Sequence, residues 1–561
     1  MKQRKYFDVH GVVGRHSRPP ARFPYLPREL CGDMQAVRVH GAAVSQAESA
    51  DYSFVAGDAK LAETIKLEPR IYGIATLPPT AALETGDPDY LRKLLDAGFR
   101  GVKVMPSKFS CGHDPRNMEQ IAGLLIERGL PLFYPAGEGF EGLTRLLEAY
   151  RELDVILLGA SWGDNRQVFP LLGRYERLHF EYSRNQANDI LELTKEHFGI
   201  KRVLFGTGWP LTSMGALKSL TEYADLSEHE KDMVAHGNAC RLLQIEPGEL
   251  ALYDDGDCEF DGIAAAADEG KPMPVPVIDA HSHMAPEEHR TVSGLMMLRS
   301  SCEYITPKLD RLGVEAVVTA PWEGIATDGM AGNAQTVFAA QQYPGRYYGY
   351  NTCNINYEKD LAGWRRWFEE YPEVFVGIKP YWPYQGFSLL DERLAPWLEY
   401  ADKRRLPLLL HSNTTEKLGE TDVLCGRYPG ITFILAHAGC DYSVAEGCVR
   451  AAKAHTNAVL EITYTTLTRG MIEYLVGEIG AERVLYGSDL PMRDPAPQLG
   501  WVAYARISEE EKRKILYENM KRLMGLRKAV SRSADAFLSP PEADSSSHGE
   551  ELRGLGGKRE G

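Results

Sequence analysis

Cysteine pairs, long apolar runs and an excess of basic residues are all missing from this 561-residue sequence. The nine cysteines are scattered and odd in number, and no Cys-x-x-Cys pair occurs. Their spacing therefore excludes a zinc ribbon or a thioredoxin-type redox motif. Scattered thiols in a chain of this length are typical of a reduced, cytoplasmic protein.

The sequence also lacks segments that would predict export, membrane insertion or nucleic-acid binding. No stretch of about 18 consecutive apolar residues occurs, and the charged N-terminal residues 1–8 are not followed by an apolar run. The formal net charge is −15, which argues against nucleic acid or an anionic membrane as a partner. We therefore expect a cytoplasmic protein that acts on a small molecule.

The chain is too long for one ordinary domain, and its two halves resemble each other. Five short segments recur in the same order and at similar intervals. The pairs are 7–10 with 278–281, 99–103 with 375–379, 130–135 with 406–411, 155–160 with 432–437, and 202–210 with 483–491. This pattern indicates a duplicated domain.

Within each half, short apolar runs alternate with amphipathic segments. The 3–4 residue spacing predicts helices over 90–97, 118–128, 393–403 and 469–476, and similar segments at 236–243 and 517–524 predict closing helices. Alternating strands and helices indicate parallel strands, and about 250 residues is the usual size of a (β/α)8 barrel. We predict an α/β protein of two tandem (β/α)8 TIM-type barrels, residues 1–252 and 275–527. Composition predicts a linker at 253–274 and a disordered tail at 528–561.

Candidate metal ligands follow the apolar runs of the second half. His281 and His283 belong to an Asp-x-His-x-His triplet, and alternate residues of a strand point to the same face. His411, His437 and Asp489 each follow a later apolar run. Because the carboxyl ends of barrel strands line one face, these side chains are expected to converge. Imidazole and carboxylate ligands suit zinc, with manganese, iron or cobalt as alternatives.

This order of residues resembles the amidohydrolase superfamily, and segments 279–283, 435–439 and 485–491 resemble its amidohydrolase 2 branch. That branch includes hydrolases, lactonases, a hydratase and non-oxidative decarboxylases of the aminocarboxymuconate-semialdehyde type. The resemblance implies that the second barrel is metal-dependent-hydrolase-like and binds one divalent ion. It assigns His281, His283, His411 and Asp489 as ligands, with His437 either joining them or polarising the substrate oxygen.

Other residues near the strand ends are candidates for substrate binding. Some binuclear relatives carry a carboxylated lysine at the position of Lys379 and use it to bridge two metals. Lys103 holds the matching place in the first half, so we favour one metal and expect Lys379 to bind a substrate carboxylate. Arg493 and Trp322 are further candidates for the pocket. Asp279 has a counterpart in Asp8 and is expected to be a structural partner of the site.

The first half keeps His10 at the position of His281 but departs from this pattern at the other four positions. The sequence places Val12 at the position of His283, Pro135 at that of His411, Ala160 at that of His437 and Gly208 at that of Asp489. None of these side chains can bind a metal, so we interpret residues 1–252 as a degenerate barrel that packs against the other one, supports a homodimer or binds a regulator. A rival interpretation is that His10, His16 and His113 form an unrelated site.

Three functions follow from these observations. The leading hypothesis is a metal-dependent hydrolase, with Asp489 and His437 as its catalytic residues, that acts on a C–N or C–O bond of a small carboxylate-bearing molecule. In it, Asp489 binds the metal through one oxygen and takes the proton of water with the other. The nearest alternative is a metal-dependent non-oxidative decarboxylase with the same ligands, since the fold alone does not decide the reaction. The third is a non-catalytic binding scaffold.

Overall fold

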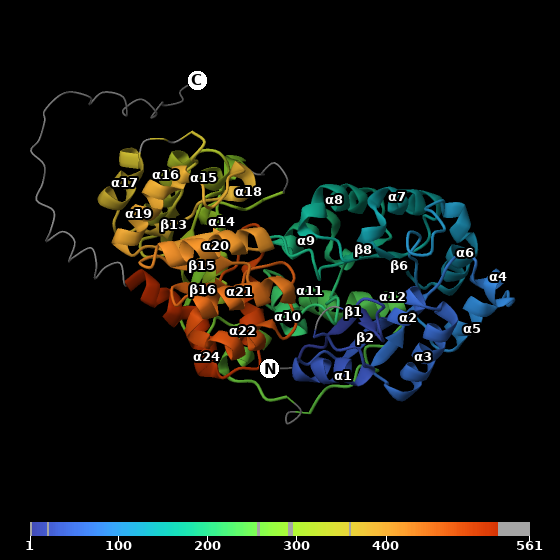
Figure 1. The fold of residues 1–561 in the computed structure, drawn as a ribbon. Coiled ribbons are helices and arrows are strands. Elements are labelled where there is room, and N and C mark those ends of the chain that lie inside the picture. Colours follow the sequence, from blue (N-terminus) through green and yellow to red (C-terminus); the bar gives the residue numbers. More distant parts are fainter. Residues whose placement is uncertain are drawn as a thin grey trace, which may run out of the picture.

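The computed structural model of the protein describes residues 3–19, 22–254, 258–289, 296–357, 359 and 361–525. The expected tail at 528–561 lies outside these residues. Two barrels lie side by side in the molecule, the first half in blue to green and the second in yellow-green to red (Figure 1). Among the described residues, every helix is too short or too polar to cross a membrane.

The second barrel is an eight-stranded parallel sheet in sequence order. Its last strand meets its first, because Ala280 N–H donates to Tyr486 O at 3.0 Å. Apolar side chains such as Ile278, Val318 and Leu409 fill the interior. The strands are β10 (Val277–Ser282), β11 (Val314–Thr319), β12 (Tyr347–Asn351), β13 (Phe375–Ile378), β14 (Pro407–His411), β15 (Thr432–Ala436), β16 (Ala458–Glu461) and β17 (Val484–Leu485).

The first half forms the same kind of barrel. Its strands make a three-stranded and a six-stranded parallel sheet, joined where Ile74 separates β3 from β4. The ring closes where Val9 N–H donates to Phe205 O at 3.0 Å. The strands are β1 (Phe7–Val13), β2 (Gly41–Gln46), β3 (Ile71–Gly73), β4 (Ala75–Thr76), β5 (Val102–Lys103), β6 (Leu132–Pro135), β7 (Val155–Leu158), β8 (Leu178–Glu181) and β9 (Val203–Leu204). The predicted tandem of TIM-type barrels is confirmed.

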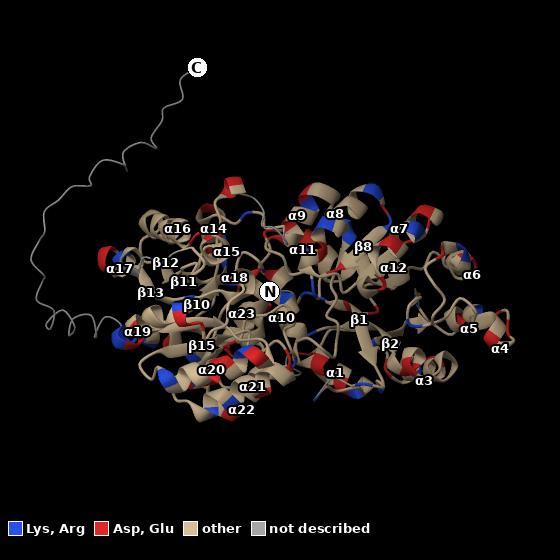
Figure 2. Cartoon of the chain, turned by 45° about the horizontal axis from the view of Figure 1, so that its top comes forward, with Lys and Arg blue, Asp and Glu red and all other residues tan. Residues whose placement is uncertain are grey.

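Amphipathic helices surround both barrels, and basic and acidic residues are interspersed along them (Figure 2). Those of the first half are α1 (Pro27–Ala36), α2 (Ala47–Asp51), α3 (Phe54–Leu67), α4 (Ala81–Thr85), α5 (Tyr90–Asp96), α6 (Glu119–Arg128), α7 (Phe140–Ala149), α8 (Asn165–Arg174), α9 (Ile190–Phe198), α10 (Met214–Glu222), α11 (Glu228–Asp232) and α12 (Asn238–Leu243).

The second half repeats this arrangement, including the closing segment, where a π-helical turn over Lys514–Glu518 matches one over Met233–Gly237. Its helices are α14 (Cys302–Leu312), α15 (Trp322–Ala326), α16 (Gly329–Gln342), α17 (Leu361–Glu370), α18 (Trp382–Gln385), α19 (Ala395–Arg404), α20 (Thr415–Arg427), α21 (Tyr442–Ala454), α22 (Met471–Ile479), α23 (Pro495–Ala503) and α24 (Glu509–Arg513). The helices predicted from periodicity are present, with ends that differ by a few residues.

The two barrels pack against each other through α10 and α23, and every residue of both helices is buried. Small residues allow this close approach, since a side chain at Gly215 would meet the Tyr504 ring and one at Gly500 would meet Ser219. The segment 253–274 is more than a linker. It contains α13 (Gly262–Asp268), whose buried side chains pack against both α10 and α23.

Candidate metal centre

The two histidines of the triplet stand at the end of β10 with fixed ring orientations. His281 Nδ1 lies 2.8 Å from Glu461 Oε2, and His283 Nδ1 lies 2.7 Å from the Ala320 carbonyl oxygen. Both partners are acceptors, so each Nδ1 carries the proton and each Nε2 presents a lone pair. Both side chains are buried. The two Nε2 atoms therefore face one common point as metal ligands do.

Asp489 brings a carboxylate to the same point. Its Oδ1 lies 3.1 Å from His283 Nε2 and 3.4 Å from His281 Nε2. The residue follows β17 with a left-handed backbone, φ +64°, and its N–H donates to the His281 carbonyl oxygen at 2.7 Å. The ligand atoms of these three residues lie within 4.8 Å of one another. Two imidazole nitrogens and a carboxylate oxygen at this spacing form a donor set that fits a divalent ion.

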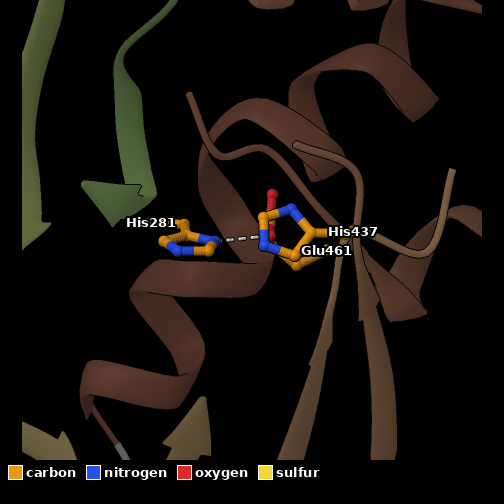
Figure 3. A group of neighbouring side chains, drawn as sticks. All are labelled: His281, His437 and Glu461. Atoms are coloured by element: carbon orange, nitrogen blue, oxygen red, sulfur yellow. Dashed lines mark hydrogen bonds and ion pairs between the residues drawn. The ribbon is translucent and has the colours of Figure 1, made fainter. Parts of the chain in front are cut away.

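His437 and His411 form a second pair beside this group. His437 Nδ1 donates to the Thr463 carbonyl oxygen at 2.7 Å, and its Nε2 faces His411 Nδ1 at 3.1 Å. His437, His281 and Glu461 converge from three strand ends (Figure 3) and could also hold an ion. Because Glu461 already contacts His281 Nδ1, we favour the group with Asp489 as the metal centre. His411 joins neither group, so its role as a ligand stays a prediction.

Two buried basic side chains, Lys379 and Arg493, complete the centre. Lys379 Nζ lies 2.7 Å from His281 Nε2 and 3.5 Å from His283 Nε2. Arg493 donates through Nη1 to Asp489 Oδ2 and through Nε to Thr465 Oγ1. Among the described residues, no acceptor is bonded to Arg493 Nη2. That group is therefore able to bind an anion.

Burial and positive charge set the ionisation of these groups. Burial lowers the pKa of His281 and His283 well below the usual range, and the charge of Lys379 adds to the effect. Burial lowers the pKa of His437 to about 3, aided by Arg493, and that of Lys379 to about 7. The histidines are therefore neutral, which is the state that binds a metal.

Aromatic side chains surround the centre. Trp322 lies 5.6 Å from His283 and Tyr381 lies 5.6 Å from His411, measured between ring centroids. Trp382 donates to the His411 carbonyl oxygen at 2.7 Å. The structure thus places Lys379, Arg493 and Trp322 at the predicted site, although their role in binding substrate stays a prediction.

The supporting hydrogen bonds include one partner that the sequence analysis missed. Glu461, which orients His281, has a counterpart in Glu181, which lies 3.0 Å from His10 Nδ1 in the first half. A glutamate at the same place in the segments 178–181 and 458–461 was the available signal. Asp279 accepts from Ser488 just as Asp8 accepts from Thr207, as expected of structural partners.

The first half keeps this support, and His10 at the position of His281, but has other residues at the remaining ligand positions. Strand register shows that one assignment from the sequence was wrong by one residue. Pro135 pairs with Leu158 as His411 pairs with Ala436, so Gly159 rather than Ala160 occupies the place of His437. Gly159 and His437 also share a left-handed backbone, with φ of +64° and +63°. The corrected residue still offers no side-chain ligand.

The histidines of the first half do not converge. His10 contacts Glu181, His16 lies 3.7 Å from Asp51, and His113 lies 3.3 Å from Ser107. Within the described ranges, no metal-capable group of three includes any of them. The rival interpretation of an unrelated site in this half therefore has no geometric support.

Solved structures of other proteins each align with about half of this chain. No curated protein sequence matches significantly. The solved 4-oxalomesaconate hydratase of Rhodopseudomonas palustris is 17% identical, with a TM-score of 0.36, over 46% of this chain and 99% of that one. A 5-carboxyvanillate decarboxylase of Novosphingobium aromaticivorans, solved with manganese, is 15% identical, with a TM-score of 0.38, over 46% of this chain and 98% of that one. A TIM-barrel protein of Bordetella bronchiseptica is 16% identical, with a TM-score of 0.36, over 45% of this chain and 100% of that one.

The amidohydrolase family model Amidohydro_2 matches the chain twice, over residues 8–245 and 278–526. Each match spans one of the two barrels, and the second contains the candidate metal centre. Together the matches cover most of the sequence, so the chain belongs to the amidohydrolase family.

Proposed function

We propose that the second barrel is a metal-dependent, non-oxidative decarboxylase of a small carboxylate-bearing molecule, and that the first barrel is a degenerate copy produced by internal duplication. The observation that carries the choice of reaction is the contact between Arg493 and Asp489. One Asp489 oxygen faces the histidine Nε2 atoms and the other accepts from Arg493. The ion pair with Arg493 on the second oxygen disfavours Asp489 as the base that takes a proton from water.

The residues present fit a divalent ion, most simply zinc, held by His281, His283 and Asp489. Such an ion, when bound, supplies Lewis-acid polarisation of a substrate oxygen. Lys379 and the free Nη2 of Arg493 are placed to bind carboxylate or phenolate oxygens. Trp322 and Tyr381 offer aromatic surface to the rest of the molecule.

The chain also provides a proton relay beside the ligands. His411 and His437 share one hydrogen bond of 3.1 Å, and the Thr463 carbonyl oxygen fixes the tautomer of His437. We infer that His411, whose Nδ1 carries the proton of this hydrogen bond, gives that proton to the substrate carbon as the bond from that carbon to the carboxylate carbon breaks and carbon dioxide leaves. Water then replaces the proton on His411, and His437 holds the His411 ring in place. Because the surroundings are buried, conversion of a charged carboxylate into neutral carbon dioxide is favoured there.

Hydrolysis of a C–N or C–O bond is the second candidate. The observation in its favour is that His437 is buried and neutral, so its Nε2 can accept a proton if His411 turns away. In that mechanism Asp489 acts only as a ligand.

A paired assay separates the two reactions. We expect the zinc-loaded protein to release carbon dioxide from members of a panel of hydroxylated aromatic carboxylates. We expect no acid release from lactones or amides in a pH-stat. His437→Ala removes the partner that holds the proton donor His411, and it should lose at least about a hundredfold in kcat, as is usual when a positioned proton transfer is lost. Acid release without carbon dioxide would refute decarboxylation, and metal binding without either activity would favour a scaffold.

A further inference from the structure

A side chain of the first barrel reaches the centre of the second. Trp162 opens a short 3-10 helix, Trp162–Asp164, that follows β7. The Arg493 guanidinium carbon lies 5.1 Å from the centroid of the Trp162 ring and 5.3 Å from that of Tyr464. Arg493 is thus held by one aromatic ring from each barrel. A guanidinium over an aromatic face is attracted to it, more strongly when both are desolvated.

The first barrel also holds the backbone around Arg493. Gln186 donates through its side-chain Nε2 to the Thr465 backbone carbonyl oxygen at 2.9 Å. The backbone carbonyl oxygen of Gln186 accepts from Asp494 N–H at 2.7 Å. The Thr465 hydroxyl accepts from Arg493 Nε, and Asp494 follows Arg493 in the chain. Buried Lys308 bridges Asp494 to Asp189 of the first barrel.

Arg493 is not in the environment of a surface residue. It is buried, and burial lowers its pKa to about 10, yet its Nη2 has no bonded acceptor within the described residues. An open donor on a buried guanidinium is a place where an anion can bind instead of water. The contacts from the first barrel thus hold an anion-binding group at a fixed place beside Asp489.

We propose that the first barrel completes the active site of the second, and that Trp162 is a positioning residue that holds Arg493 for a substrate carboxylate. The choice of a carboxylate rests on the proposed function. The degenerate barrel would then be retained because it supplies one wall of the site, although it has lost most of the metal ligands of its own. The geometry assigns this task to the Trp162 ring, supported by Gln186.

Matched variants of the full chain test the role of the ring. Trp162→Phe keeps an aromatic face, whereas Trp162→Leu keeps apolar volume without one. Phe140→Leu, at the start of α7 and far from the second barrel (Figure 1), is the control. The first readout is the rate at which phenylglyoxal modifies Arg493, followed by peptide mapping. The second is the affinity for benzoate, measured by titration calorimetry of zinc-loaded protein.

We expect Trp162→Leu to speed modification of Arg493 severalfold and to weaken benzoate binding by about tenfold, the scale of a desolvated cation–π contact. Trp162→Phe should keep the modification rate and the benzoate affinity close to those of the wild type, and Phe140→Leu should change neither quantity. Once a substrate is identified, KM should rise about tenfold in Trp162→Leu, while kcat should stay within about twofold of the wild-type value. Loss of a merely structural contact would not raise KM while leaving kcat nearly unchanged.

Wild-type benzoate affinity in Trp162→Leu would overturn the inference, whether or not modification of Arg493 is faster, and so would a wild-type protein that binds no benzoate. These outcomes are distinct from failure of the proposed function. In that case the protein releases no carbon dioxide, while benzoate binding and its dependence on Trp162 are still measured.

Discussion

Glu461 determines which nitrogen of His281 faces the metal centre. Its carboxylate lies 2.8 Å from Nδ1, so the proton stays on that nitrogen and Nε2 is free. We predict that Glu461→Gln lowers the zinc affinity of the full chain by about tenfold, as is usual for partners of ligating histidines. Competition with a chromophoric chelator measures this change. Glu181→Gln alters the equivalent pair in the first half, and an equal loss in that variant would refute the assignment.

Asp58 makes stability depend on pH in the opposite sense from most carboxylates. It is buried in α3, Ser49 donates to one of its oxygens, and the other oxygen has no partner among the described residues. Burial raises its pKa from 3.8 to about 7. The folded chain therefore keeps the proton up to about pH 7, whereas the unfolded chain loses it near pH 4. Between these values the contribution of Asp58 to stability falls as pH rises.

Asp58→Asn should remove this dependence. At pH 8 we expect the variant to be more stable than the wild type by roughly 2–4 kcal/mol, whereas at pH 4 the two should differ little. Denaturant unfolding at both pH values measures the difference. Exposed Asp225→Asn serves as the control and should behave as the wild type at both. An identical difference at pH 4 and pH 8 would show that Asp58 is ionised in the folded chain.

Among the elements, α10 and α23 form the tightest contact between the barrels. A Cβ atom at Gly215 would lie 2.4 Å from Cγ of Tyr504, whereas one at Gly123 in α6 would meet nothing within 4 Å. We predict that Gly215→Ala destabilises the protein by about 1–3 kcal/mol through overpacking. Gly123→Ala should stabilise it by up to about 1 kcal/mol through helix propensity. Thermal unfolding compares them, and stabilisation by both would contradict the packing described here.

Strand ends were the most predictable elements. The positions of His281, His283 and Asp489 followed from alternation along β10 and from the rule that barrel strands end on one face, and the three side chains meet as expected. Glu461 was missed because its partner is 180 residues away in sequence. The helix α13 was missed because its four alanines resemble a linker until the neighbouring helices that bury them are known.

Register within a strand was less predictable. The repeated segments 155–160 and 432–437 are so uniformly apolar that they align almost equally well when shifted by one residue. Only the pairing of β7 with β6, compared with that of β15 with β14, shows that Gly159 occupies the position equivalent to His437. The contacts of Trp162 and Gln186 with the second barrel were not predictable from the sequence, because they depend on how the two barrels pack.

At the scale of the whole molecule, one buried lysine joins the two barrels. Lys308 of α14 pairs with Asp189 of the first half and Asp494 of the second, and also donates to Asn188 Oδ1 at 2.9 Å. Lys308→Met would leave two buried carboxylates without a cation. We predict a loss of about 3–5 kcal/mol in unfolding free energy. Arg92→Met breaks the exposed pair with Glu127 and should leave stability unchanged. Equal effects of the two variants would refute a structural role for Lys308.

The central claim is that the second barrel alone binds a divalent metal. The most direct test is elemental analysis of the full-length protein after loading with Zn²⁺ and removal of free metal. We predict about one zinc per chain in the wild type and in His10→Ala, and almost none in His283→Ala. A wild type without stoichiometric metal, or one whose zinc survives His283→Ala but is lost in His10→Ala, would contradict the account.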